Sequence, residues 1–223
     1  VGVRFGCPVP FFWRFPPLRV TTYAPRPSFC HHSPDLRHHH PDLLAQTVDC
    51  HDRETLDRIN LIALNREIRA AHDIARGRGA IAVNIMKAVA AHPAYVRQSC
   101  ESGAHAIVMG AGLPLDLPDM TRDFPDVALI PILSNARGVN IVVKKWLRKQ
   151  RLPDAIIIEH PRYAGGHLGA AKLEELQDAR FDFDRVIPEI HAIYDQLGIA
   201  RDAIPVIAAG GINSPRRLRA ALE

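Results

Sequence analysis

The chain has 223 residues, of which 47% are hydrophobic, and its formal net charge is +4. This length suits one large domain or two small ones, and the composition supplies enough apolar side chains for a substantial core. The basic residues are scattered without the aromatic residues of a nucleic-acid reader, and no apolar run approaches the roughly 20 residues that span a bilayer, so we expect neither a nucleic-acid nor a membrane partner.

The first 34 residues differ from the rest of the chain. They contain seven prolines and no acidic residue, since the first carboxylate is Asp35. Prolines at this density interrupt both helices and central strands. We therefore expect residues 1–34 to be an irregular Pro/Arg-rich segment, disordered or non-native, and residues 35–223 to form the folded domain.

Beyond this segment, apolar strands alternate with helices. Residues 55–76 place apolar side chains at helical spacing, and Gly77 and Gly79 end that helix. Short apolar runs predict strands at residues 80–85, 104–109, 127–132, 154–158 and 204–208. Further helices are predicted at residues 93–102, 137–148, 183–197 and 215–223, the last with Ser214 as its cap and Pro215 at its first position.

The predicted strands are short and apolar on both faces, which is typical of a parallel sheet covered by helices. Five strand–helix units cannot close an eight-stranded barrel. An open doubly wound sheet would also accommodate five parallel strands. The composition alone does not separate these two α/β architectures.

Two glycine-rich loops follow predicted strands. The first contains Gly165, Gly166 and His167 after the apolar run 155–158, and the second contains Gly210 and Gly211 after the strand at 204–208. Glycine allows the main chain to approach a flat or anionic ligand closely, and histidine exchanges protons near neutral pH. The two loops indicate a barrel that holds a phosphorylated cofactor.

The cysteines and the clustered histidines give no metal or disulfide signal. The spacing of the four cysteines suits neither zinc nor a disulfide framework, which favours a reduced, cytoplasmic location. The histidines near the N-terminus lack carboxylate or cysteine partners at ligand spacing, so no metal is expected. These residues are Cys7, Cys30, Cys50, Cys100, His31, His32, His38, His39 and His40.

From about Asp35 to Glu223, six segments resemble the nitronate monooxygenase family, formerly called 2-nitropropane dioxygenases. They occur in the family's order and with similar spacing, at residues 82–86, 103–114, 124–132, 152–159, 164–169 and 204–212. The resemblance implies a (β/α)8 TIM-type barrel that binds FMN at the carboxyl ends of its strands. On that template the chain supplies the third to seventh strands. The family's first two strand units and its eighth strand have no counterpart, so we expect a truncated, N-terminally altered chain.

The resemblance also implies an activity and its partners. The activity is the FMN-dependent oxidation of an alkyl nitronate or nitroalkane by O2, which yields a carbonyl compound and nitrite. A homodimer is left open. A flavin-dependent enoyl-acyl-carrier-protein reductase that uses NADH or NADPH is an alternative within the same structural group. An inactive barrel fragment is the second alternative.

Particular residues match the family's site. His167 resembles the catalytic histidine, which acts as a base or hydrogen-bonding group toward the substrate. Asn84 matches an asparagine that contacts the flavin, although it could instead cap a strand end. His160 stands where many members carry a glutamine near the flavin. The remaining matches are glycines: Gly165 and Gly166 would pass close to the cofactor, and Gly210 and Gly211 would bind its phosphate unless they form an ordinary tight turn.

Overall fold

The computed structural model describes residues 40–45, 52–163, 170 and 172–222. Its α-helices are α3 (Pro41–Ala45), α4 (Arg53–Ala75), α5 (His92–Glu101), α6 (Leu117–Met120), α7 (Ala136–Leu147), α8 (Phe183–Leu197) and α9 (Pro215–Leu222). Its strands are β1 (Ala82–Met86), β2 (Ala106–Gly110), β3 (Ala128–Leu133), β4 (Ile156–Glu159) and β5 (Val206–Ala209). Three short 3-10 helices, η1 (Pro161–Tyr163), η2 (Leu173–Gln177) and η3 (Ala179–Phe181), lie between β4 and α8. The predicted segment 1–34 lies outside the described residues and stays a prediction.

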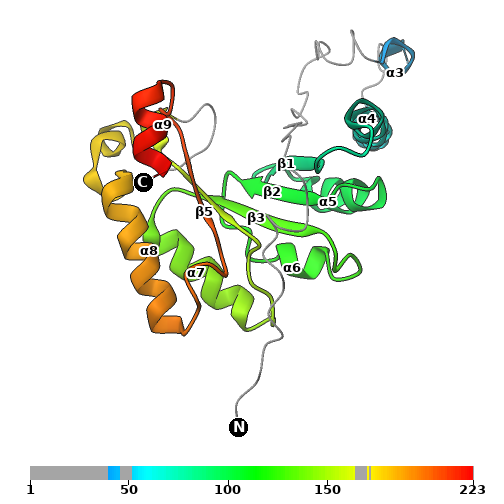
Figure 1. Cartoon of the computed structure of the whole chain (residues 1–223). Coiled ribbons are helices and arrows are strands. Elements are labelled where there is room, and N and C mark those ends of the chain that lie inside the picture. Colours follow the sequence, from blue (N-terminus) through cyan, green and yellow to red (C-terminus); the bar gives the residue numbers. More distant parts are fainter. Residues whose placement is uncertain (1–39, 46–51, 164–169, 171, 223) are drawn as a thin grey trace.

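All five strands are parallel and lie side by side in the order in which they occur along the chain (Figure 1). Their carboxyl ends therefore meet at one edge of the sheet, and β1 and β5 stand at its two sides. A doubly wound sheet would reverse its strand order at a switch point. The uninterrupted order is that of a barrel wall.

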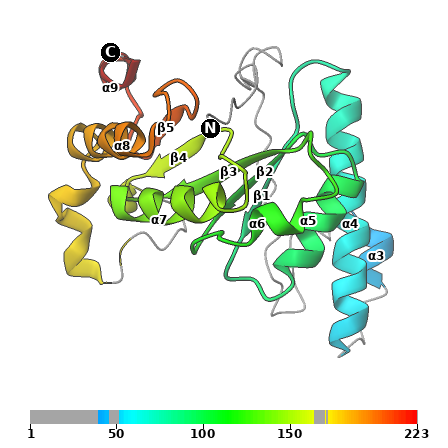
Figure 2. The same ribbon diagram turned by 90° about the horizontal axis from the view of Figure 1, so that it is seen from below.

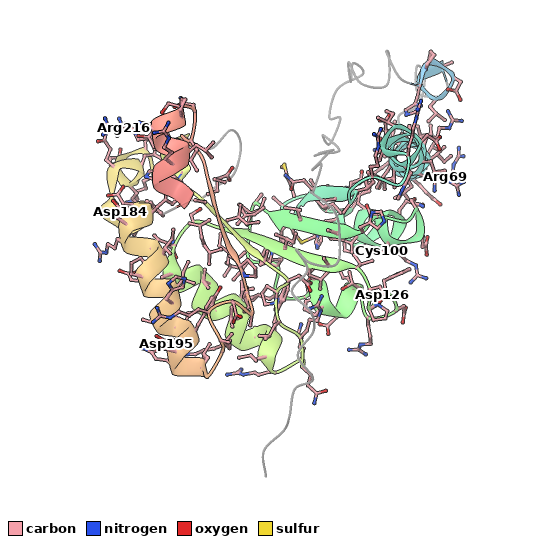
Figure 3. The ribbon with its side chains drawn as sticks, in the orientation of Figure 1. Arg69, Cys100, Asp126, Asp184, Asp195 and Arg216 are labelled. Atoms are coloured by element: carbon pink, nitrogen blue, oxygen red, sulfur yellow. The ribbon has the colours of Figure 1, made fainter. Side chains whose placement is uncertain are left out.

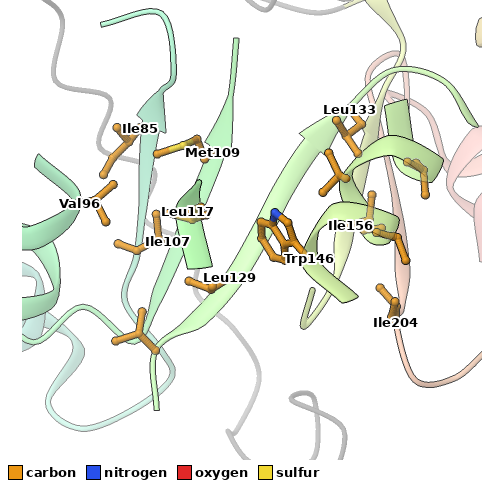
Figure 4. Close-up of a cluster of buried hydrophobic side chains, with 14 of the residues drawn as sticks. Ile85, Val96, Ile107, Met109, Leu117, Leu129, Leu133, Trp146, Ile156 and Ile204 are labelled. Carbon is orange, nitrogen blue, oxygen red and sulfur yellow. The ribbon is translucent and has the colours of Figure 1, made fainter. Parts of the chain in front are cut away.

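In the described part of the chain, the helices cover only one face of this sheet. The larger buried cluster joins strand residues such as Ile107 and Ile158 to residues of α4, α5, α6, α7 and α8 (Figure 4). On the opposite face, a second cluster consists of residues in or beside the strands, including Ala106, Val108 and Ile130, and contains no helix residue. Figure 2 shows α4, α5, α6, α7 and α8 around the outside of the sheet. We call the helix-free face the inner face.

One-sided covering settles the choice that the sequence leaves open. A doubly wound sheet needs helices on both faces, whereas a barrel wall has helices outside and strand side chains inside. The α/β barrel prediction is therefore confirmed, with five described strands of the eight that a closed barrel requires.

A proline lies inside the central strand β3 without breaking the sheet. Residues 128–131 of β3 pair with β2, and Ile132 and Leu133 pair with β4. Pro131 is therefore the last residue of β3 that pairs with β2, and the residues after it pair with β4. A proline has no N–H to donate to a ladder, so this stagger gives it a place in a central strand. Such staggering is also what lets a sheet curve toward a barrel.

Side chains cap the amino ends of three helices. One of these caps was predicted from the sequence and two were not. The Asp52 carboxylate accepts the Thr55 N–H at 2.9 Å to begin α4, and Asn135 Oδ1 accepts the Gly138 N–H at 2.9 Å to begin α7. Ser214 Oγ accepts the Arg217 N–H at 3.3 Å, so the predicted cap of α9 is confirmed. The short helices α3 and α6 were not predicted because five and four residues are too few to show a period.

Charged side chains lie on the outer surface of the helices, as Arg69, Asp184 and Asp195 do in Figure 3. Trp146 of α7 is fully buried, and its indole N–H donates to the Pro114 carbonyl at 3.0 Å, which fixes the loop after β2 against the helix layer. Within the described ranges, no helix is both long and apolar enough to cross a bilayer.

Adjacent isoleucines of β4 test the one-sided packing. Ile158 is fully buried against the helices, whereas Ile157 is partly exposed on the inner face. We expect Ile158→Ala to lower the free energy of unfolding by about 2–5 kcal/mol, because it leaves a cavity in the packed layer. Ile157→Ala should lower the free energy of unfolding by less, because Ile157 is only partly buried. Urea unfolding of both variants measures the difference, and equal losses would contradict one-sided covering.

A histidine beside the amino ends of β1 and β2 should make stability depend on pH. His105 Nδ1 accepts the Ile81 N–H at 2.8 Å, which requires an unprotonated nitrogen. Burial, with a smaller contribution from His72, lowers the pKa of His105. The unfolded chain, with a histidine pKa near 6.5, then binds more protons than the folded one as pH falls. The contribution of neutral His105 to the free energy of unfolding is therefore complete above about pH 6.5 and is lost as the pH falls below it.

We expect the urea midpoint of the wild-type chain to fall between pH 7.5 and pH 5.5, values that bracket a histidine pKa of about 6.5. His105→Asn is the matched variant, because its Oδ1 can accept the Ile81 N–H and does not titrate. Its midpoint should fall less over the same range. An identical pH dependence in the two proteins would show that His105 is not the titrating group.

Candidate functional site

Asn84 is the first of the predicted site residues that the structure describes. Asn84 lies in β1, directly opposite Val108 of β2. Because side chains alternate along a strand, it shares the inner face with Ala82 and is turned away from the helices. A polar residue in this place interrupts an otherwise apolar face.

The Asn84 carbonyl oxygen is buried and accepts no hydrogen bond from any described residue. Leaving such an oxygen unpaired costs roughly 1–3 kcal/mol, so native structures rarely keep one without a reason. A strand-end cap would use this oxygen to accept a backbone N–H. The described hydrogen bonds do not support that alternative, and the inner face offers a place for a ligand that carries N–H donors.

Glu159 is a second polar residue on the inner face, and sequence reasoning did not select it. It ends β4, pairs with Ala209 of β5, and shares the alternation of Ile157. The signal was available in the sequence, because in the run 155–160 every second residue faces the same way. Asn84, in the middle of β1, and Glu159, at the carboxyl end of β4, thus share one face of the sheet.

His160 lies on the other side of the sheet. It follows Glu159, so alternation turns its imidazole toward the helix layer, where it is 7% exposed. Its ring packs against Tyr163, Phe181 and Phe183, with centroid separations of 4.9, 6.5 and 5.9 Å. Its Nε2 is 3.4 Å from a carboxylate oxygen of Asp182. The structure does not bring His160 together with Asn84, and a contact between His160 and a flavin stays a prediction.

Gly210 and Gly211 follow β5 with φ angles of +97° and +75°, the left-handed region that favours glycine. A Cβ at Gly211 would lie 2.9 Å from Tyr163 Cδ2, and one at Gly210 would lie 3.3 Å from Tyr163 Cβ. Tyr163 therefore packs directly on this turn. Its close packing explains the need for glycine at both positions without any ligand. Their backbone N–H groups donate to no acceptor in the described part of the chain, so they remain suited to an anion.

The loop with Gly165, Gly166 and His167 lies outside the described residues. The positions of the predicted catalytic histidine and its two glycines stay predictions. Tyr163, the last described residue before this loop, ends η1 and lies beside Gly210 and Gly211.

An ion pair joins two neighbouring loops at this edge. Lys87 Nζ lies 2.6 Å from both carboxylate oxygens of Asp116 and 2.9 Å from His92 Nε2. Burial alone would raise the pKa of Asp116, but the hydrogen bonds and charge of Lys87 outweigh it and the pKa is lowered. Gly112, at φ +134°, leaves room for the Lys87 stem. These contacts hold the loops after β1 and β2 together.

These residues fit a flavin mononucleotide. The Asn84 oxygen, which has no described donor, suits the N–H edge of a flat heterocycle, and the amides of the turn after β5, which have no described acceptor, suit a phosphate. Asn84 lies in β1 and the turn follows β5, which are the two outermost strands of the described sheet.

The comparisons with known proteins agree with this fold. The nitronate monooxygenase family model matches residues 58–223. FabK from Thermotoga maritima has a similar structure, with 21% sequence identity, a TM-score of 0.51, and coverage of 71% of this chain and 43% of FabK. A mutant of the same FabK gives 19% identity, a TM-score of 0.50, and coverage of 71% and 46%. No curated protein matches the chain.

The chain spans less than half the length of these FabK structures, and at this identity the likeness concerns the fold alone. The family match is broader, because it runs from α4 to the last residue and includes all five strands. This chain therefore belongs to the nitronate monooxygenase family of flavin-dependent oxidoreductases.

Proposed function

We propose that this chain holds FMN at the carboxyl edge of its sheet and oxidises alkyl nitronates, or their parent nitroalkanes, with O2 to a carbonyl compound and nitrite. The observation that carries the proposal is the buried, unpaired Asn84 oxygen on the helix-free face of a chain from this family. That oxygen needs a donor, and the flavin supplies one where the family would bind it.

The chain's own residues would bind and orient the cofactor. Asn84 would accept a hydrogen bond from the flavin ring, and the amides of Gly210 and Gly211 would bind the phosphate. The apolar inner face, with Val108 and Ile130, would exclude water from beneath the ring. The bound flavin supplies the redox chemistry, because it accepts electrons from the substrate and passes them to oxygen.

His167 would act on the substrate. A nitronate is an anion, and a protonated imidazole or its N–H can stabilise the negative charge on the nitro oxygens. If the neutral nitroalkane is the substrate, the unprotonated imidazole can remove its α-proton. The proposal assigns both roles to His167.

Two other functions remain to be separated from this one. The likeness to FabK concerns fold at low identity, yet a reductase that uses NADH or NADPH would share the barrel and the flavin. A chain that folds without retaining flavin would have neither activity. The source of electrons for the bound flavin distinguishes all three.

Anaerobic reduction of the flavin is the direct test. The full chain is loaded with FMN, and the visible absorbance of the flavin is followed after addition of ethyl nitronate, NADH or NADPH. We expect the nitronate to bleach the flavin and the two nicotinamides to leave it oxidised. Bleaching by a nicotinamide but not by the nitronate would overturn the proposal in favour of a reductase, and failure to retain FMN would overturn both.

The same assay tests His167. His167→Ala should slow oxidation of nitroalkane by roughly 100-fold or more, a usual range for loss of a general base, and leave FMN affinity unchanged. His191→Ala is the matched control, because His191 lies on α8 outside the sheet. Equal rates for His167→Ala and the control would remove His167 from the mechanism.

A further inference from the structure

Two arginines and one tyrosine gather beside the turn after β5. Arg162 Cζ lies 5.6 Å and Arg217 Cζ lies 5.8 Å from the centre of the Tyr163 ring. Arg162 comes from η1 after β4, and Arg217 from the first turn of α9 after β5. Two segments about 50 residues apart along the chain therefore bring their cationic groups to one aromatic ring.

This cluster is fixed to the Gly210–Gly211 turn. The Tyr163 ring occupies the space that a side chain on Gly211 would need. Arg217 Nη1 also donates to the Gly211 carbonyl at 2.7 Å. The guanidinium of Arg217 thus lies in hydrogen-bond contact with the turn whose glycine N–H groups donate to no described acceptor.

The positive charge here has no described counter-ion. Among the residues that the structure describes, no carboxylate forms an ion pair with Arg162 or Arg217. The Asp182 carboxylate lies 3.4 Å from His160 Nε2, and no ion pair between Asp182 and either arginine is described. Other arginines of the domain, such as Arg185 and Arg201, are paired with a carboxylate. An anion beside the two guanidinium groups would supply the counter-charge that no described carboxylate provides.

The backbone adds donors of its own. The N–H groups of Gly210, Gly211 and Ile212 donate to no described acceptor, and left-handed glycines turn such groups toward a shared concavity. The set of donors is therefore two guanidinium groups and a run of free amides. This combination matches the several acceptor oxygens and double charge of a phosphate monoester.

We propose that Arg162 and Arg217 supply the charge that makes this chain select a phosphorylated flavin over an unphosphorylated one. This inference rests on the proposed function, because it takes the flavin to be the ligand of the adjacent inner face. Tyr163 acts as a positioning residue, since its ring holds both arginines beside Gly211. The group that these arginines would bind is a phosphate monoester, and the flavin ring would be bound by the inner face.

The test compares FMN with riboflavin, which lacks the phosphate. Dissociation constants for both are measured with the full chain by quenching of flavin fluorescence, for wild type and for the double variant Arg162→Gln, Arg217→Gln. Glutamine keeps a donor for the Gly211 carbonyl but carries no charge. We expect FMN binding to weaken about tenfold or more in the double variant, and riboflavin binding to stay the same.

Arg216→Gln is the matched control, because Arg216 is an exposed neighbour on α9 with no contact to Tyr163 among the described interactions (Figure 3). Inorganic phosphate should compete with FMN in wild type and leave riboflavin unaffected, and Arg162→Lys with Arg217→Lys should restore part of the preference for FMN. Wild type that binds FMN no better than riboflavin, or a double variant that keeps the preference, would overturn the inference while flavin binding stands. Binding of neither flavin would overturn the proposed function itself.

Discussion

The structure depends on a sheet that is covered by helices on one face only. Each strand contributes alternate side chains to two different surroundings: Ile156 and Ile158 pack into the helix layer, and Ile157 joins the inner face. The larger buried cluster joins the strands to the helices, and the cluster on the inner face is smaller. The inner face is also where the Asn84 oxygen lies without a described hydrogen-bond donor.

The same alternation separates residues that stand side by side in the sequence. Glu159 and His160 are neighbours, yet one is turned to the inner face and the other packs among aromatic rings on the helix side. His160 therefore stabilises the passage from β4 to η1, where Tyr163 reaches the turn after β5. The inner face, where we propose that the flavin binds, and the packed helix side thus meet within these few residues.

The sequence predicts much of this architecture and little of its site geometry. The five strands and the long helices follow from apolar periodicity, and Ser214 is recognisable as a cap. Periodicity could not show that the described helices cover one face, because the strands carry apolar residues on both sides. The contact of Tyr163 with Gly211 and the ion pair of Lys87 with Asp116 join residues far apart along the chain. Such contacts are set by the order and stagger of the strands, which a local pattern does not contain.

The central claim is that FMN binds at the carboxyl edge of the sheet and on its inner face. Hydrogen–deuterium exchange of the full chain, with and without FMN, tests it directly. The account predicts slower exchange with FMN at residues 84–87, 110–112 and 210–213, and unchanged exchange at the amino edge, at residues 104–106 and 151–154. Protection at the amino edge, or none at the carboxyl edge in the presence of bound FMN, would contradict it.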